Sequence, residues 1–100
     1  MSFFDPKVPT GQEYFTIDFS RQVPAGATIV SAVCVPTRIK GSADATPANM
    51  LSGGCIINGT KVSQKLINGV DGTLYLLTYL ATLSDGQVVP EIMYLWVRAA

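Results

Sequence analysis

The last quarter of the chain contains two long apolar segments, 73–83 and 88–97, separated by Ser84-Asp85-Gly86-Gln87. Both segments are rich in β-branched, aromatic and leucine residues, and an Asp-Gly pair between such runs is typical of a β-hairpin. A strand with one buried face alternates apolar and polar side chains, whereas here apolar side chains fill both sets of alternating positions. The sequence therefore predicts a hairpin that is apolar on both faces.

A helix over residues 73–83 is the alternative, since Leu74, Leu77 and Ala81 would share one helical stripe. The segment between Gly72 and Asp85-Gly86 would give only about three helical turns. A strand is favoured on this ground and on the alternating placement of its Thr and Tyr residues.

A two-residue turn at Asp85-Gly86 would place Leu83, Tyr79, Leu77 and Tyr75 opposite Val88, Ile92, Tyr94 and Trp96, respectively. The opposite face would then collect Leu74, Leu76, Leu80, Met93 and Leu95. A β-bulge would shift the pairing, but both faces would stay apolar. Which face forms the core is left open by the sequence.

Only one of these faces can meet the opposing sheet of a single sandwich, so the other needs a cover. The long loop or the N-terminal segment could provide that cover, but we favour contact with another subunit, because the exposed apolar patch would otherwise be around the largest that soluble monomers tolerate.

The rest of the chain reads as short strands separated by turns. Residues 13–19 alternate, with Phe15, Ile17 and Phe19 on one side, and Pro24-Ala-Gly26 predicts a turn before a second strand at 27–35. Residues 38–54 predict a long loop, and Asn58-Gly59 predicts a tight hairpin before a strand at 62–67. We therefore expect an all-β antiparallel sandwich of six or seven short strands over residues 13–100.

Residues 1–12 contain Phe3, Phe4, Pro6, Pro9 and Gly11, a composition that predicts an extended N-terminal arm rather than a helix or a strand of normal length. Two adjacent phenylalanines would be a liability if exposed on an arm. They are expected either to insert into a neighbouring subunit or to fold back on their own domain.

Composition argues against several classes of partner. Only 14% of the residues are charged and the formal net charge is zero, so the chain lacks the basic surface that binds nucleic acid or an anionic membrane. No apolar run is long enough to span a membrane, and the N-terminus has no secretory signal pattern. The 48% hydrophobic content favours a chain that packs against neighbours, as a homo-oligomer or as repeated copies in a symmetric assembly.

The usual chemistry of an active site is also missing. The chain has no histidine, which removes the commonest general base and metal ligand. Most of its seven carboxylates lie beside turn residues, and an acid and base pair for glycoside hydrolysis is disfavoured among them. Cys34 and Cys55 lack further zinc ligands; free thiols are favoured and a disulfide stays open. The expectation is a protein without catalytic, metal or cofactor sites.

Four short motifs bear a family resemblance: Tyr14-Phe-Thr-Ile-Asp-Phe-Ser, Pro24-Ala-Gly-Ala-Thr-Ile-Val-Ser-Ala, Gly72-Thr-Leu-Tyr and Ser84-Asp-Gly. Over residues 13–97 the chain resembles the small immunoglobulin-like structural proteins of tailed phages known as fibre-tail adaptors. The resemblance implies an immunoglobulin-like sandwich in which Tyr75, Leu77 and Ala81 face the core. In that family the intervening positions are mostly polar, whereas here they are Leu74, Leu76 and Leu80.

The expected function is a non-enzymatic structural component of a bacteriophage virion, assembled in the host cytoplasm, that joins tail or head-tail parts to fibres. Its expected partners are other virion structural proteins and copies of itself. The candidate interface residues are Phe3, Phe4, Leu74, Leu76, Leu80, Met93 and Leu95. A capsid decoration (cement) protein is the nearest alternative, and a carbohydrate-binding module that uses Trp96 or Tyr94 is an alternative of another class.

Overall fold

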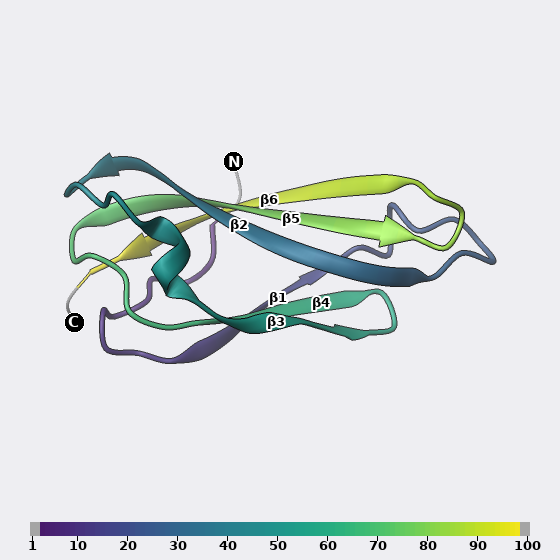
Figure 1. The fold of residues 1–100 in the computed structure, drawn as a ribbon, viewed down its shortest axis with the longest axis horizontal. Helices are drawn as coiled ribbons and strands as arrows, with labels where there is room; N and C mark the ends of the chain where they lie inside the picture. Colours follow the sequence, from purple (N-terminus) through teal and green to yellow (C-terminus); the bar gives the residue numbers. More distant parts are fainter. Residues whose placement is uncertain (1–2, 99–100) are drawn as a thin grey trace.

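The computed structural model describes residues 3–98 and folds them into two antiparallel three-stranded sheets that face each other (Figure 1). The N-terminal sheet has the order β1-β4-β3 and consists of β1 (Glu13–Asp18), β4 (Lys61–Leu66) and β3 (Leu51–Asn58). The C-terminal sheet has the order β2-β5-β6 and consists of β2 (Ile29–Gly41), β5 (Thr73–Leu83) and β6 (Val88–Val97). A single turn of 3-10 helix, η1 (Pro47–Met50), leads into β3.

This strand order is that of an immunoglobulin-like sandwich, in which the second, fourth and fifth strands of the full fold form one sheet and the third, sixth and seventh form the other. A second hallmark is the tyrosine at the start of β5. The hydroxyl of Tyr75 accepts a hydrogen bond from the Val70 backbone N–H at 3.0 Å and donates one to Asp44 Oδ2 at 2.7 Å. The tyrosine thus fastens the turn that joins the two sheets, as a tyrosine corner does.

The core lies between the sheets and takes the alternate side chains of each strand. Tyr75, Leu77, Tyr79 and Ala81 of β5 are fully buried, and for Tyr75, Leu77 and Ala81 this agrees with the inward orientation implied by the resemblance. They pack against residues of the opposing sheet and its flanks, including Phe15, Ile17, Phe19, Met50, Val62 and Leu66.

The second strand is longer than its sequence predicts, and the loop after it is shorter. β2 extends through Pro36 to Gly41, and β3 begins at Leu51, so only residues 42–50 separate the two strands. The glycine, proline and serine residues scattered over 38–54 favoured a loop in the sequence. The strand nevertheless continues to Gly41, and bulges next to Val30 and Ile39 interrupt its regular pairing with β5. The predicted turns at Pro24-Ala25-Gly26 and at Asn58-Gly59 are confirmed.

The C-terminal hairpin is confirmed, but its predicted pairing is wrong by one residue. Tyr79 lies opposite Glu91 and Tyr75 opposite Leu95, rather than opposite Ile92 and Trp96. The cause is the turn: the Leu83 N–H donates to the Gln87 carbonyl at 2.8 Å, the Gly86 N–H donates to the Leu83 carbonyl at 3.0 Å, and Gly86 has a φ of +92°. This longer turn with a glycine bulge moves every residue of β6 by one position relative to β5.

Part of the predicted arm lies along the free edge of β6. The backbone N–H groups of Phe4 and Lys7 donate to the carbonyls of Tyr94 and Trp96, both at 2.9 Å, and Phe3 and Lys7 form parallel bridges with β6. The ammonium group of Lys7 is buried and donates to the backbone carbonyls of Val8, Pro9 and Asn68. Burial lowers the pKa of Lys7, and the nearby Glu13 carboxylate partly offsets that effect.

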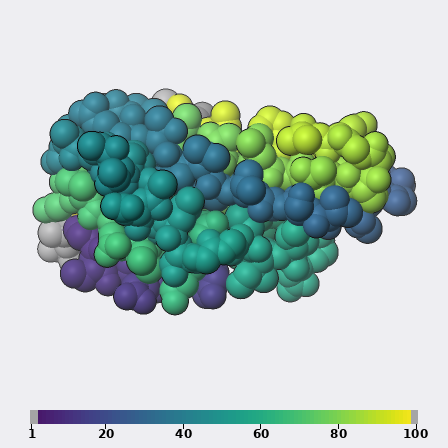
Figure 2. Space-filling view, in the orientation of Figure 1, coloured from purple at the N-terminus to yellow at the C-terminus, as the bar shows by residue number. Residues whose placement is uncertain are grey.

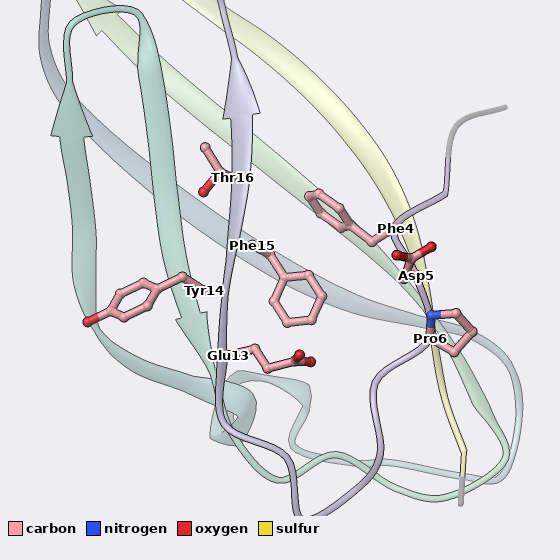
Figure 3. A pocket seen from close by; sticks show the side chains of 7 residues that line it. All are labelled: Phe4, Asp5, Pro6, Glu13, Tyr14, Phe15 and Thr16. Carbon is pink, nitrogen blue, oxygen red and sulfur yellow. The ribbon is translucent and has the colours of Figure 1, made fainter. Parts of the chain in front are cut away.

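Phe4 folds into its own domain. Its ring packs edge-on against Phe15 and Tyr79, with centroids 5.1 and 6.4 Å away, and Figure 3 shows Phe4 and Phe15 pointing toward one another. Of the two outcomes expected for this residue, folding back is therefore the one observed. Phe3 remains 48% exposed and stacks on Tyr94 with 5.4 Å between ring centroids.

Both cysteines carry free thiols. Cys34 is buried on the inner side of β2, and burial raises its pKa to about 12, with Cys55 adding to the effect and a hydrogen bond with Tyr79 opposing it. The Tyr79 hydroxyl donates to the Phe15 carbonyl at 2.9 Å, which ties the two sheets together.

Candidate assembly surface

The two sheets have outer faces of opposite character. On the N-terminal sheet the outward side chains are mainly polar: Tyr14, Ser52, Ile56, Asn58, Lys61, Ser63, Lys65, Thr16 and Asp18. Thr16 and Ser63 hydrogen-bond across this face at 2.7 Å. The face therefore has the composition of an ordinary solvated sheet surface.

The outer face of the C-terminal sheet is apolar over most of its length. The strand pairing places these residues on it: Ser31, Val33, Val35 and Thr37 of β2; Leu74, Leu76, Thr78, Leu80 and Thr82 of β5; and Val88, Pro90, Ile92, Tyr94 and Trp96 of β6. We call this set the outer face. Phe3 continues it at the β6 edge through its stacking on Tyr94.

The outer face is not roofed by the described part of the chain. Val33 and Val35 are 54% and 48% exposed, and Val88 and Ile92 are 58% and 50% exposed. The segment from 42 to 50, which was a possible cover, instead lies at one end of the sandwich beside β2 and β3 (Figure 1). Exposed β-branched side chains thus flank a half-buried central row from β5.

The predicted interface residues divide between the two faces. Leu76 and Leu80 lie on the outer face, half-buried, and Phe3 lies beside it. Leu74 also points outward, but it is only 5% exposed within its own chain. The assignment of Met93 and Leu95 to the outer face is wrong, because the one-residue shift in pairing turns both toward the core. Phe4 likewise belongs to the interior.

Sequence reasoning missed the most exposed members of the surface, Val33, Val35, Val88 and Ile92. A signal was present in β2, where Val33 and Val35 alternate with Ala32, Cys34 and Pro36, so this strand too is apolar on both sides. The β6 residues could be assigned only once the hairpin register was known.

The free edge of β2 is protected against strand addition. Pro36 pairs with Leu77 inside the ladder, and a proline fits there only if its nitrogen points away from the partner strand. The free edge consequently lacks a donor midway along the strand, and the bulges at Val30 and Ile39 make it irregular at both ends.

The free edge of β6 is covered in a different way. The arm occupies the part next to Tyr94 and Trp96. Further along, the side-chain amide of Gln22 donates to the Pro90 carbonyl at 2.8 Å and to Glu91 Oε1 at 2.6 Å, and Pro90 itself has no N–H to offer. The C-terminal sheet therefore has protected edges and an open face.

Charges lie at the two ends of the outer face, and no carboxylate lies on it. At one end the Lys40 ammonium and the Arg98 guanidinium lie 5.9 and 5.6 Å from the centre of the Trp96 ring. At the other end, Asp85 occupies the hairpin tip and accepts a hydrogen bond from the Gln87 N–H at 3.0 Å. Two cations already contact the Trp96 ring, which weakens the idea that Trp96 is a bare platform for sugars.

A pocket of about 330 Å³ lies between the arm and β1 (Figure 3). Asp5 and Glu13 line it, and both side chains are exposed to solvent. The apolar side chains of Phe4, Pro6 and Phe15 also line the pocket beside these two carboxylates.

Within residues 3–98, no group of three or more Cys, Asp or Glu side chains is arranged to hold a metal ion. In the same range no helix has the length and apolar character needed to cross a membrane.

Comparison with known proteins does not identify a family. No protein-family model matches the chain, and no curated protein sequence matches it either.

Proposed function

We propose that the protein is a non-enzymatic structural subunit that acts by burying the outer face of its C-terminal sheet against neighbouring protein. The observation that carries the proposal is the contrast between the two outer faces of one small sandwich. One is mainly polar, with Tyr14 and Ile56 as its exposed apolar side chains, whereas the other exposes Val33, Val35, Val88 and Ile92, which are about half accessible. Apolar surface of this kind is favourably removed from water at about 25 cal/mol per Å².

The protected edges of the same sheet support this proposal. Proteins protect free strand edges to avoid uncontrolled pairing, and here both edges carry such protection while the apolar face between them does not. The arrangement favours a defined contact through side chains over open-ended addition of strands.

The setting that we propose is the particle of a tailed phage, on the strength of the four motifs that resemble fibre-tail adaptors. In that setting the protein would join tail or head-tail parts to fibres through contacts with other virion proteins, or it would cement the capsid exterior. Both roles use the same face and require no catalytic group.

The test is to locate the protein in particles produced by the phage genome that encodes it. Antibodies against the chain, imaged by electron microscopy, are expected to label the tail or the capsid, and the position decides between adaptor and decoration protein. Purified particles without the protein would contradict the proposal. Titration of the soluble chain with glycans separates it from the carbohydrate-binding alternative, which requires saturable binding that is lost in a Tyr94→Ala variant.

A further inference from the structure

The outer face has the properties needed to bind a second copy of this chain. A face built on β5, which has 11 residues, measures about 35 Å by 15–20 Å when the flanking strands are included. Two such faces together remove about 1,000–1,400 Å² from water, which reaches the lower range of specific interfaces. If the partner is a second copy, one two-fold contact removes the outer faces of both copies from water.

The direction of packing follows from the charges at the ends of the face. Face-to-face copies can be related by a two-fold axis that runs either along the strands or across them. An axis along the strands places Lys40 and Arg98 against the same residues of the partner, and like charges at an interface are unfavourable. An axis across the strands instead places these cations over the partner's hairpin tip, which carries Asp85.

The geometry points to a homodimer in which the outer faces of two copies pack with antiparallel strands, so that the Lys40 and Arg98 end of each copy lies over the Asp85 tip of the other. This inference rests on the proposed function, since it names the occupant of the same face. Thr78 marks the middle of β5 and pairs with Val35 and Ile92. The two-fold axis therefore passes near this row, and each residue of the row faces its own counterpart.

The first experiment measures the mass of the full chain in solution by light scattering and sedimentation, from low micromolar to near-millimolar concentration. We expect twice the 10.7 kDa of one chain at the upper end. Ile92→Glu is expected to weaken dimerisation at least about tenfold. Ile56→Glu is the matched control, because Ile56 is also an isoleucine, is 52% exposed and lies on the opposite sheet. A mass of one chain at every concentration, or equal disruption by both variants, overturns the inference.

The second experiment tests the direction of packing with two charge variants, Lys40→Glu combined with Arg98→Glu, and Asp85→Lys. In the antiparallel dimer each variant alone brings like charges together and binds itself more weakly than the wild type does. A mixture of the two restores opposite charges at both ends and is expected to form heterodimers with wild-type affinity. Variants that self-associate as tightly as wild type, with a mixture tighter still, would show strands that run parallel and would overturn the inference.

A third experiment locates the axis. Under mild oxidation Ile92→Cys is expected to give a disulfide-linked dimer, and Ile56→Cys is not. If Ile92→Cys links only to a Val35→Cys chain, the packing direction is wrong. Failure of all dimer experiments, together with positive labelling of phage particles, would remove the second copy as the occupant and leave the proposed structural role in place.

Discussion

At the scale of single residues, Gly41 at the end of β2 occupies a position where the backbone conformation and the surrounding space both exclude a side chain. Its φ is +92°, and a Cβ atom at this position would lie 2.0 Å from the carbonyl oxygen of Gly72. The residue thus combines a left-handed backbone with close contact to another backbone segment, and only glycine meets both conditions.

The Gly41→Ala substitution is expected to lower the free energy of unfolding by more than about 2 kcal/mol, because the strain of a left-handed alanine alone costs roughly 1–2 kcal/mol and the clash adds to it. Gly26→Ala is the control, since Gly26 has a φ of +85° with no atom near the added methyl group. Urea denaturation measures both. Equal losses in the two variants would show that the contact with Gly72 carries no cost.

The buried thiol and hydroxyl groups predict an upper pH limit of stability. Burial raises the pKa of Cys34 to about 12, and burial also raises the pKa of Tyr79. Above pH 9 the unfolded chain loses protons that the folded chain keeps, so the free energy of unfolding falls as pH rises. The lowered pKa of Lys7 acts in the opposite direction up to about pH 10.4, but the groups with raised pKa outnumber it.

We therefore expect stability to decline from pH 9 upward, with Cys34 contributing about 2 kcal/mol of the loss by pH 10.5. Chemical denaturation at a series of pH values measures this decline. A Cys34→Ala variant should be less stable at pH 7 but should show a shallower slope above pH 9. An unchanged slope in that variant would mean that Cys34 ionises equally easily in the folded and unfolded chain.

At the scale of elements, the described part of the N-terminal arm, from residue 3 onward, is part of the sandwich. It extends the β6 edge with parallel hydrogen bonds, inserts Phe4 between the sheets and is fastened by the buried Lys7 ammonium. Its adjacent phenylalanines have different environments, because neighbouring residues of an extended segment point in opposite directions.

Phe4→Ala is expected to lower the free energy of unfolding by about 2–3 kcal/mol, somewhat less than the loss of a fully buried phenylalanine. Phe3→Ala should cost less than about 1 kcal/mol in the monomer, because the Phe3 ring is half exposed and contacts mainly Tyr94. Thermal and urea unfolding of the two variants at low concentration tests the difference. The reverse order would contradict the observed placement of the arm.

The free edge of β2 depends on Pro36. Pro36→Val is expected to leave the fold intact and to increase aggregation at high concentration, since valine supplies the N–H that the edge now lacks. Thr37→Val adds apolar surface on the same strand without a new free donor and serves as the control. Light scattering over time compares them, and equal aggregation of the two variants would show that apolar surface, not the edge donor, sets this behaviour.

At the scale of the whole molecule, the accessible surface area is ordinary for the mass of the chain, but the shape is elongated. The accessible area of 5532 Å² is close to the roughly 5,500 Å² expected for a folded monomer of this mass. The molecule is elongated, with extents of 43 × 22 × 22 Å, and Figure 2 shows the tip of the β5–β6 hairpin at one end of the long axis. The outer face therefore extends along most of the long axis of the molecule.

The dimer makes thermal stability depend on concentration. Because dissociation accompanies unfolding of a dimer, a hundredfold increase in protein concentration is expected to raise the Tm of the wild type by several degrees through mass action. The Ile92→Glu variant should show little dependence over the same range. Differential scanning fluorimetry at matched concentrations measures both, and a wild-type Tm that does not change with concentration would count against dimerisation.

The sequence by itself determined the type of fold and the presence of surplus apolar surface. Side-chain alternation in residues 13–19, the turn signals at Asn58-Gly59 and Asp85-Gly86, and the doubly apolar segments 73–83 and 88–97 are local features, and local sterics and periodicity govern them. The prediction that both faces of the hairpin are apolar holds in the observed register as well as in the predicted one, because apolar residues occupy both sets of alternating positions.

Only the tertiary structure decided which residues form the outer face. One bulge residue at Gly86 exchanges the faces of β6, so Met93 and Leu95 turn inward and Ile92, Tyr94 and Trp96 turn outward. The length of β2 and the position of Phe4 depend on pairing with strands far away in the sequence. Such pairing is set by the combined packing of both sheets, and no local pattern of residues encodes it.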